Sequence, residues 1–293
     1  MAAAKVKPAP GLGRIMLKQR IVTAVVLVSA LLAAVLFLPL LQLSTVFGVA
    51  VLIAAWEWSR LAGFQNLYAR IGYVVLIAVL LIASYIYCGF NSRVDVLNLK
   101  PILGLACLWW SIALLWIKGF PVSAGLWATV PMRCLMGVLV LVPAWLSLIL
   151  LFSYSHGKSL LLFLVMIVAA EDIGAFFVGR AWGRRKLALA VSPGKTWEGF
   201  YGGMLSSLFF GLVAWYIADW QGLSLLALMA IIAFTALAAV VGDLLESMMK
   251  RHSQIKDSGN LLPGHGGFMD RIDSLTAAAP VFTLGLILSG WQL

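Results

Sequence analysis

The chain has 293 residues, of which 63% are hydrophobic and only 11% are charged, and its mean hydropathy is +1.02. This composition lies far outside that of soluble globular domains and indicates a membrane protein. The net charge of +10 comes from short basic stretches beside apolar runs. Such stretches suit anionic lipid headgroups and phosphorylated ligands, so we expect no nucleic-acid partner.

Nine apolar runs are candidates for membrane-crossing helices. In chain order they cover residues 21–42, 45–58, 72–89, 101–117, 134–153, 159–178, 201–218, 223–243 and 275–291. Because a backbone in lipid must satisfy its own hydrogen bonds, these runs predict an all-α, polytopic transmembrane helical bundle. The second run is short and is interrupted by Glu57, so we expect it to be re-entrant or to lie against its neighbour. The first run is longer than the apolar core of a secretion signal and predicts a retained helix.

The basic residues predict the orientation of these segments. If the N-terminus lies in the cytoplasm and the nine segments alternate, 18 of the 21 Lys and Arg residues fall on the cytoplasmic side. The exceptions are Arg93, Lys100 and Lys158. Cytoplasmic loops of membrane proteins are enriched in Lys and Arg, so this bias supports both the segment count and the orientation. We expect the C-terminus on the opposite side.

Acidic residues divide the chain unevenly. Only Glu57 and Asp95 precede residue 155, whereas nine acidic residues follow it. We therefore expect a cytoplasmic basic tail over residues 1–20, a transmembrane scaffold over 21–155 and a catalytic transmembrane region over 156–293. The three cysteines lie in or beside apolar runs without a paired spacing, so they indicate neither a disulfide framework nor a zinc site.

The first polar site lies inside the sixth apolar run, at Glu171 and Asp172. A carboxylate at the centre of an isolated membrane helix costs ~2.5–3.5 kcal/mol on insertion scales. We therefore expect Asp172 above all to face the bundle interior or a wet cavity. The alternative is an ion pair with Arg180 or Arg184 that only holds helices together.

The second polar site is a predicted turn at residues 192–194, Ser-Pro-Gly, followed by Lys195 and Thr196 at the start of the seventh segment. A helix N-terminus attracts phosphate through its free N–H groups and its dipole, and Lys195 adds a positive charge. Ser192 and Thr196 add hydroxyl donors. The spacing of a P-loop is absent, and an ordinary capped helix start is the alternative.

The third polar site holds two pairs of acidic residues. Asp243 and Glu246 are three residues apart and share one helical face, and Asp270 and Asp273 have the same spacing. Two such pairs at one interface offer the oxygen ligands that Mg²⁺ prefers. Salt bridges such as Glu246 with Lys250 are the alternative, in which the carboxylates only orient the basic residues.

Between these pairs lies a glycine-rich turn at residues 263–267, Pro-Gly-His-Gly-Gly. Glycine lets backbone N–H groups approach a phosphate closely, so we expect Gly266 and Gly267 to contribute to a phosphate site. His265 is a candidate phosphate donor or proton carrier. The basic candidates for binding phosphate groups are Lys195, Lys250, Arg251, Lys256 and Arg271.

Residues 247–273 read SMMKRHSQIKDSGNLLPGHGGFMDRID. This stretch closely resembles the signature of the phosphatidate cytidylyltransferase (CDP-diacylglycerol synthase) family. Residues 172–179 and 192–196 resemble two upstream blocks of the same family. Earlier parts of the chain agree with the family only in hydropathy.

The resemblance implies the reaction CTP + phosphatidate → CDP-diacylglycerol + pyrophosphate at the cytoplasmic face of a bacterial inner membrane. It implies a Mg²⁺-dependent homodimer in which Asp243 and Asp270 bind metal, with Asp172 and Asp273 as helpers. The catalytic candidates are Asp243, Lys250, His265, Asp270 and Arg271. Two other functions remain open from the residues alone: a CTP-dependent lipid kinase and an ion-coupled transporter that uses its intramembrane acids.

Overall fold

The computed structural model describes residues 12–91, 94–218, 223–261 and 266–291, with the backbone alone for residues 12–21. Most of these residues are helical. The helices are α1 (Leu12–Phe37), α2 (Leu40–Leu61), α3 (Leu67–Tyr87), α4 (Val96–Gly119), α5 (Ala124–Trp127), α6 (Val130–Ser153), α7 (Gly157–Trp182), α8 (Trp197–Ile217), α9 (Leu225–His252) and α10 (Met269–Leu288). A short hairpin of β1 (Lys186–Ala188) and β2 (Ser192–Thr196) joins α7 to α8.

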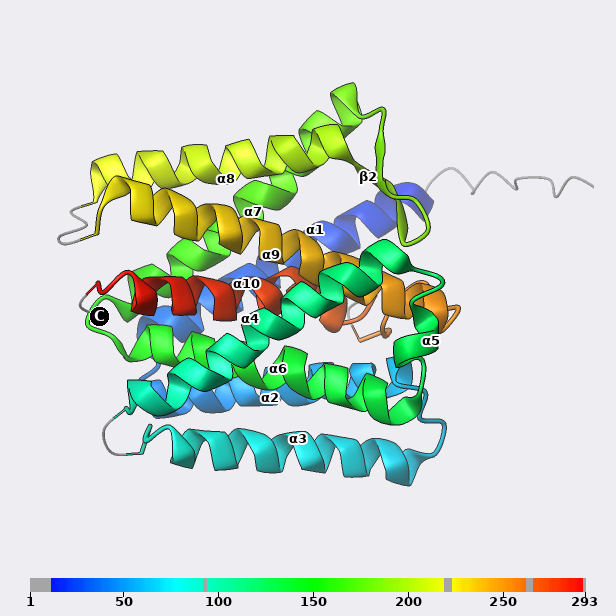
Figure 1. Ribbon diagram of the computed structural model, residues 1–293, viewed down its shortest axis with the longest axis horizontal. Helices are drawn as coiled ribbons and strands as arrows, with labels where there is room; N and C mark the ends of the chain where they lie inside the picture. Colours follow the sequence, from blue (N-terminus) through cyan, green and yellow to red (C-terminus); the bar gives the residue numbers. More distant parts are fainter. Residues whose placement is uncertain (1–11, 92–93, 219–222, 262–265, 292–293) are drawn as a thin grey trace, which may run out of the picture.

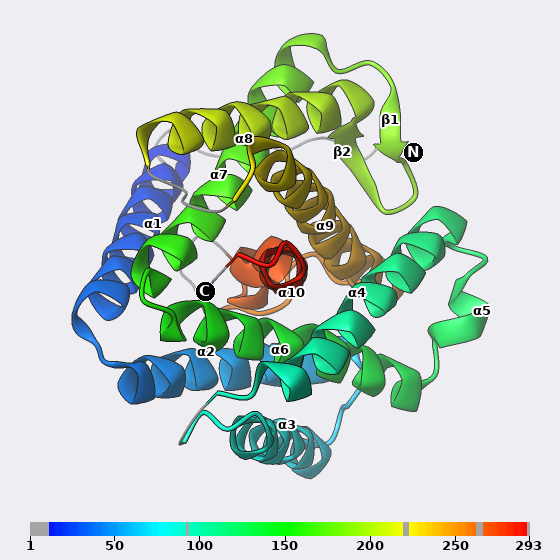
Figure 2. The same ribbon diagram turned by 60° about the vertical axis from the view of Figure 1, so that its left-hand side comes forward.

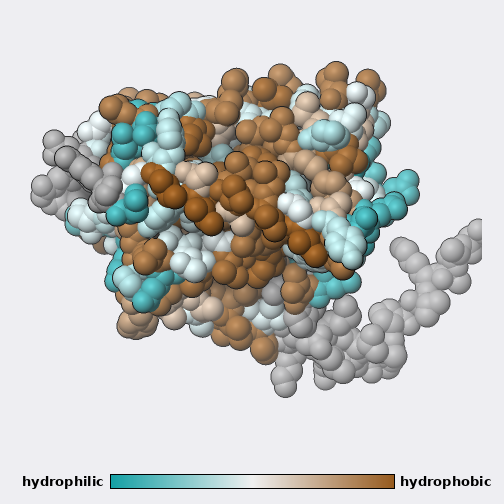
Figure 3. Space-filling view, turned by 90° about the horizontal axis from the view of Figure 1, so that it is seen from below, coloured by the Kyte–Doolittle hydropathy of each residue, from teal (hydrophilic) through white to brown (hydrophobic). Residues whose placement is uncertain are grey.

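Eight of the described helices are long and apolar enough to cross a membrane, and α1 adds a shorter apolar stretch, Val22–Phe37. In Figure 1 the long helices run back and forth between two ends of the molecule. Figure 3 shows hydrophobic side chains across the middle of one face and hydrophilic ones mostly toward its two ends. These features confirm the prediction of an all-α polytopic membrane bundle.

The second apolar run is the clearest difference from the expected segments. The break before it falls at Leu38 and Pro39, and α2 then continues for 22 residues through Glu57 to Leu61. This length suffices for a full crossing, so the expectation that the segment is short is wrong. The helix tolerates Glu57 because the carboxylate is buried against polar partners, with 2% of the residue exposed.

Helix α10 lies at the centre of the bundle, with the other long helices around it (Figure 2). It packs against α9, α6, α4, α7 and α2. Small residues permit this position, because Ala277, Ala278 and Ala279 form a fully buried stretch of α10. A Cβ at Gly242 of α9 would collide with the backbone of Asp273, so the two helices cross closely at that point.

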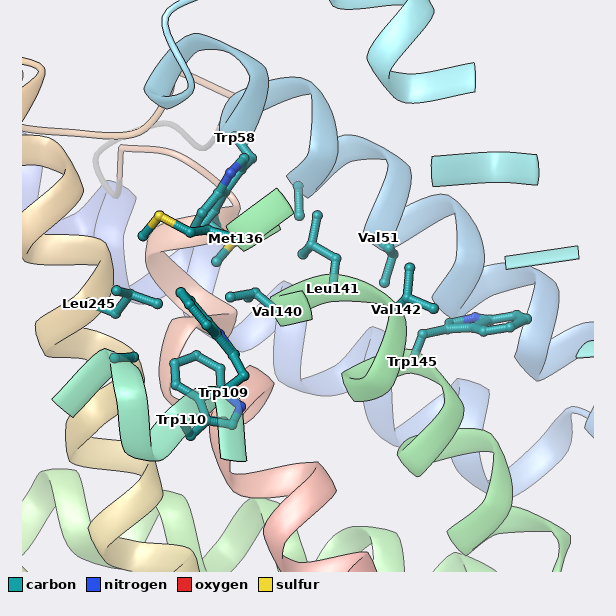
Figure 4. Packing of buried hydrophobic residues seen from close by; sticks show 14 of the residues in the cluster. Val51, Trp58, Trp109, Trp110, Met136, Val140, Leu141, Val142, Trp145 and Leu245 are labelled. Atoms are coloured by element: carbon teal, nitrogen blue, oxygen red, sulfur yellow. The ribbon is translucent and has the colours of Figure 1, made fainter. Parts of the chain in front are cut away.

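The hydrophobic core crosses the predicted boundary between scaffold and catalytic region. One cluster joins Trp58 of α2, Trp109 and Trp110 of α4, and Met136 of α6 to Leu245 of α9. Figure 4 shows these side chains turned toward one another from their separate helices. The first and second halves of the chain therefore share one packed interior, and residues from both halves reach the same end of the bundle.

Candidate functional site

Most of the predicted site residues that the structure describes lie on α7, β2, α9 and α10. Helices α7 and α9 end on the right in Figure 1. Two of these helices extend beyond the apolar runs. Helix α9 continues to His252 and carries Asp243, Glu246 and Lys250, while α10 starts at Met269 and carries Asp270 and Asp273 near its N-terminus. The acidic pairs therefore lie on helices, which fixes their relative positions.

The segment around Lys195 differs from the predicted turn and helix start. Residues Ser192–Thr196 form strand β2, which pairs antiparallel with β1, and α8 begins only at Trp197. The Thr196 hydroxyl caps α8 by accepting a hydrogen bond from the Gly199 N–H at 3.2 Å. The prediction that Ser192, Pro193 and Gly194 form a turn is wrong, because backbone pairing with β1 extends them.

Strand β2 brings Lys195 to helix α9. The Lys195 Nζ lies 2.6 Å from Oδ2 of Asp243, and both side chains are a little over one quarter exposed. Burial would lower the pKa of Lys195, but attraction to the Asp243 carboxylate outweighs it, so the pKa is raised above its ordinary value. Lys195 is therefore a fixed positive charge at neutral pH.

Lys250 forms the second ion-paired centre. Its Nζ lies 2.6 Å from Glu246 Oε2, one helical turn away on α9, and 2.5 Å from Asp270 Oδ1 on α10. The Glu246 side chain is 1% exposed, and its Oε1 atom is buried without a hydrogen-bond partner. The salt bridge between Glu246 and Lys250, which was the alternative to metal binding, is thus present, and it holds the ammonium group where α9 meets α10.

Asp270 is held on its other side by the loop that precedes α10. Its Oδ2 accepts hydrogen bonds from the Gly267 N–H at 2.8 Å, the Ser258 N–H at 3.1 Å and the Ser258 hydroxyl at 3.0 Å. The Gly267 N–H therefore donates to a carboxylate in this structure, and its role in binding phosphate stays a prediction. Gly266 adopts a φ of 85°, a conformation that glycine takes easily.

Other predicted residues are placed around these two centres. Arg251 donates from Nε to the Val191 carbonyl oxygen at 3.1 Å and so ties α9 to the hairpin. Lys256 and Arg271 are exposed. Asp273 interacts electrostatically with Asp243 and Lys250. His265, together with Pro263 and Gly264, lies outside the described residues.

The acidic pair of α7 joins the same cluster. Glu171 is 2% exposed and packs against Gly203 of α8, where a Cβ would collide with its carboxylate. Asp172 is exposed and lines a cavity, and it interacts electrostatically with Lys195, Asp243 and Arg271. Asp172 thus lines a cavity, as expected, but the walls of this cavity are mainly apolar.

That cavity has a volume of about 490 Å³. Its walls are mainly apolar side chains of α1, α2, α6 and α7, including Leu31, Ala50 and Val168. The start of α10 lines it as well, and this part contributes Asp270, Arg271 and Asp273. An apolar space inside the membrane region thus meets the charged cluster.

The charged cluster contains more acidic than basic side chains. Its six acidic side chains are those of Glu171, Asp172, Asp243, Glu246, Asp270 and Asp273, whereas its basic side chains are those of Lys195, Lys250 and Arg271. An excess of negative charge is costly away from water. The buried Oε1 atom of Glu246 also has no hydrogen-bond partner, although Oε2 of the same carboxylate pairs with Lys250. The oxygen-rich set therefore suits an added hard cation. The described residues contain no group of three Asp, Glu, His or Cys side chains close enough together to hold a metal ion without rearrangement.

Sequence reasoning missed Glu57, which we considered only as an interruption of an apolar run. The structure places its carboxylate against the loop before α10, where Ser258, Phe268 and Met269 donate hydrogen bonds to it. An acidic residue in the last turns of a membrane helix was the available signal. No spacing rule linked it to residues 200 positions away.

Comparisons with known proteins identify the family of the chain. A model of the cytidylyltransferase family matches residues 18–288. A protein of Pseudomonas aeruginosa named phosphatidate cytidylyltransferase is 44% identical over 94% of this chain and 99% of its own length. A protein of the same name from Haemophilus influenzae is 38% identical over 92% of this chain and 98% of its own length. The chain belongs to the cytidylyltransferase family.

Proposed function

We propose that this protein is a phosphatidate cytidylyltransferase, which converts CTP and phosphatidate into CDP-diacylglycerol and pyrophosphate. One observation carries the proposal: an apolar cavity within the bundle ends at a cluster of fixed charges. A substrate that combines acyl chains with an anionic phosphate suits both parts of such a site. The names of the two full-length relatives support the same reaction.

The basic residues account for the binding of two anionic substrates. Lys195 and Lys250 are held in place by carboxylates, so their ammonium groups need little reorganisation when a phosphate arrives. Arg271 lies where the cavity meets the cluster, a position that suits the phosphate of a lipid. The more exposed Lys195, near the hairpin, suits the triphosphate of CTP.

The reaction requires an oxygen of the phosphatidate phosphate to attack the α-phosphorus of CTP, with pyrophosphate as leaving group. Phosphatidate is already ionised at neutral pH, so no strong general base is needed. The main barrier is the repulsion between two anions. Fixed cations that hold the reactants in line and neutralise developing charge lower this barrier.

Mg²⁺ fits the acidic excess of the cluster and completes the proposal. Asp243, Asp172 and Asp273 would hold it, and Asp270 would offer Oδ1 alone because the backbone N–H groups of Ser258 and Gly267 already donate to Oδ2. When bound, the ion would neutralise negative charge on the phosphate groups. The side chains themselves keep the two lysines in position.

The proposed site faces the cytoplasm of a bacterial cell, and the protein resides in the inner membrane. The loops at the site end carry most of the basic residues, which is the usual distribution for cytoplasmic loops. CTP is a cytoplasmic nucleotide, so this orientation gives it access. The family resemblance also supports a homodimer, which cross-linking in native membranes would test.

Isotope placement tests the reaction directly. Protein purified in detergent is supplied with phosphatidate, Mg²⁺ and CTP labelled at either the α- or the γ-phosphate. Label from the α-position should enter the lipid, and removal of Mg²⁺ should stop this transfer. Lipid labelled only from the γ-position would indicate a kinase, and the absence of any turnover without an ion gradient would favour a transporter.

A further inference from the structure

Glu57 is a buried carboxylate from the part of the chain that we expected to be scaffold. It lies near the end of α2, and 2% of the residue is exposed. A carboxylate so far from water needs hydrogen-bond partners to remain there. All its hydrogen-bond donors described above belong to the loop and first turn that carry Asp270. We propose that Glu57 is a positioning residue, which fixes the start of α10 and thereby the placement of Asp270 against Lys250.

The contacts resemble a helix cap supplied by another helix. Glu57 Oε1 accepts from the Phe268 N–H at 3.0 Å, and Oε2 accepts from the Met269 N–H at 2.7 Å. The first N–H groups of a helix have no partner within it, and a negative charge there also favours the helix dipole. Phe268, at the N-cap position, makes no side-chain cap of its own. Glu57 of α2 takes over this role for α10.

Ser258 connects the cap to Asp270. Its hydroxyl lies 3.1 Å from Glu57 Oε2 and 3.0 Å from Asp270 Oδ2, and its backbone N–H donates to the same Asp270 atom. The hydroxyl has one hydrogen and can serve only one carboxylate at a time. The backbone bond remains in either case, so Ser258 sits between the two carboxylates and holds them at a fixed separation.

The loop is also shaped to fit around Glu57. A Cβ at Gly259 would collide with the Glu57 carboxylate, and a Cβ at Gly267 would collide with Ser258 and approach Glu57 Oε2 at 2.7 Å. Backbone thus contacts the carboxylate at two separate places, where any larger residue would push it away. The close packing of Gly259 and Gly267 is a second observation beside the hydrogen bonds. It also indicates that Glu57 fixes the loop before α10.

Loss of the Glu57 charge should therefore loosen the start of α10 and move Asp270. Lys250 depends on Asp270 for one of its two carboxylate partners, so the ammonium group would shift as well. Small displacements of catalytic groups cost large factors in rate, because the reactants no longer meet in line. Glu57 itself would touch neither substrate, so its loss should lower turnover more than substrate affinity.

The kinetics of Glu57→Gln test this inference. The rate is measured with the proposed cytidylyltransferase reaction, so this test rests on the proposed function. Gln keeps the shape but replaces one acceptor oxygen with a donor that faces N–H groups. We expect kcat per folded molecule to fall at least tenfold while the KM for CTP changes less than threefold. Glu57→Asp, which keeps both acceptors, should recover part of the rate. An unchanged kcat, or a loss confined to KM, would overturn the inference.

A matched control separates positioning from a general loss of helix capping. Asp95 caps α4 at the opposite end of the bundle by accepting from the Leu97 N–H at 2.9 Å. Asp95→Ala should lower the melting temperature without changing kcat per folded molecule. An equal loss of kcat in Asp95→Ala and Glu57→Gln would show that Glu57 contributes only to stability.

Hydrogen exchange gives a readout that does not require turnover. In Glu57→Gln, amide exchange should accelerate over residues 266–270 and remain unchanged in α4. Unchanged amide exchange over residues 266–270 would refute the inference that Glu57 fixes the start of α10. This result does not depend on which reaction the protein catalyses. If Glu57→Gln fails to fold, Ser258→Ala serves instead. Ser258→Ala should lower kcat about three- to tenfold and leave the Met269 amide protected from exchange. A wild-type kcat in this variant would refute the inferred connection from Glu57 through Ser258 to Asp270.

Discussion

The Lys195 ammonium group lies 2.6 Å from the Asp243 carboxylate, so one ion pair connects the β-hairpin to α9, the helix that also carries Glu246 and Lys250. The two side chains remain partly exposed, which leaves room for an anion to approach Lys195. The pair therefore has two functions in the proposed enzyme: it positions a cation for the triphosphate and it restrains a carboxylate that would bind metal.

Replacement of Lys195 by Met should weaken CTP binding. Met keeps most of the apolar stem and loses the charge, so helix content and membrane insertion should not change. We expect the KM for CTP to rise at least tenfold or kcat to fall by a similar factor, measured with purified protein. Lys186→Met is the matched control, because Lys186 is an exposed cation of the same hairpin. Equal kinetics in the two variants would remove Lys195 from the site.

Asp270→Asn should reduce turnover by at least about 100-fold, which corresponds to about 2.7 kcal/mol of lost transition-state stabilisation. The Asp270 side chain is 8% exposed and pairs with Lys250, so this ion pair is not a screened surface contact. An Asn amide cannot accept at both oxygen positions, so the melting temperature should fall as well. Asp95→Asn, at the far end of the bundle, should leave turnover intact. Wild-type turnover by Asp270→Asn would contradict its assignment to the site.

A larger side chain in the apolar cavity should discriminate against long-chain lipid. Ala50 of α2 lines the cavity, whereas its neighbour Val49 is exposed on the outer face of the same helix. Ala50→Phe should raise the KM for long-chain phosphatidate several-fold and leave the KM for CTP unchanged. Val49→Phe should change neither. If Ala50→Phe discriminates no more than Val49→Phe, the cavity does not hold acyl chains.

Cysteine labelling in intact cells tests the orientation. In a background without Cys88, Cys107 and Cys134, a Cys at position 189 of the hairpin turn should resist membrane-impermeant maleimide. A Cys at position 155, in the exposed turn after α6, should be labelled. The opposite pattern would place the charged cluster outside the cytoplasm.

The number and alternation of helices could be predicted because hydropathy reports directly on the membrane interior. The ends of the helices could not be predicted in this way. A charged residue ends an apolar run in the sequence, but the helix itself can continue past that residue. Helix α9 continues past Asp243 to His252, since Lys195 and Lys250 neutralise carboxylates that would otherwise be costly to bury. Likewise, α10 starts before its apolar run because Glu57 caps it.

The sequence indicated charged residues that the structure brings together, but it did not indicate the contacts between them. Spacing indicated that Asp243 and Glu246 share a helical face, and the structure places both on α9. Nothing in the spacing indicated which lysine would pair with which carboxylate, because those pairs depend on how separate helices cross. The hairpin was missed because the Ser-Pro-Gly sequence is typical of a turn, whereas pairing with β1 extends it.

The distance along the chain between Glu57 and its donors has a consequence for biosynthesis. The partners lie 201, 211 and 212 positions after Glu57. At ~5–20 residues per second, a ribosome makes the partners roughly 10–40 s after Glu57 itself. During that interval the Glu57 carboxylate lacks these three hydrogen-bond donors, so we expect the end of α2 that carries it to stay in contact with water. Burial of Glu57 then coincides with the docking of α10. This late step of folding fills the centre of the bundle and brings Asp270 and Asp273 into the charged cluster.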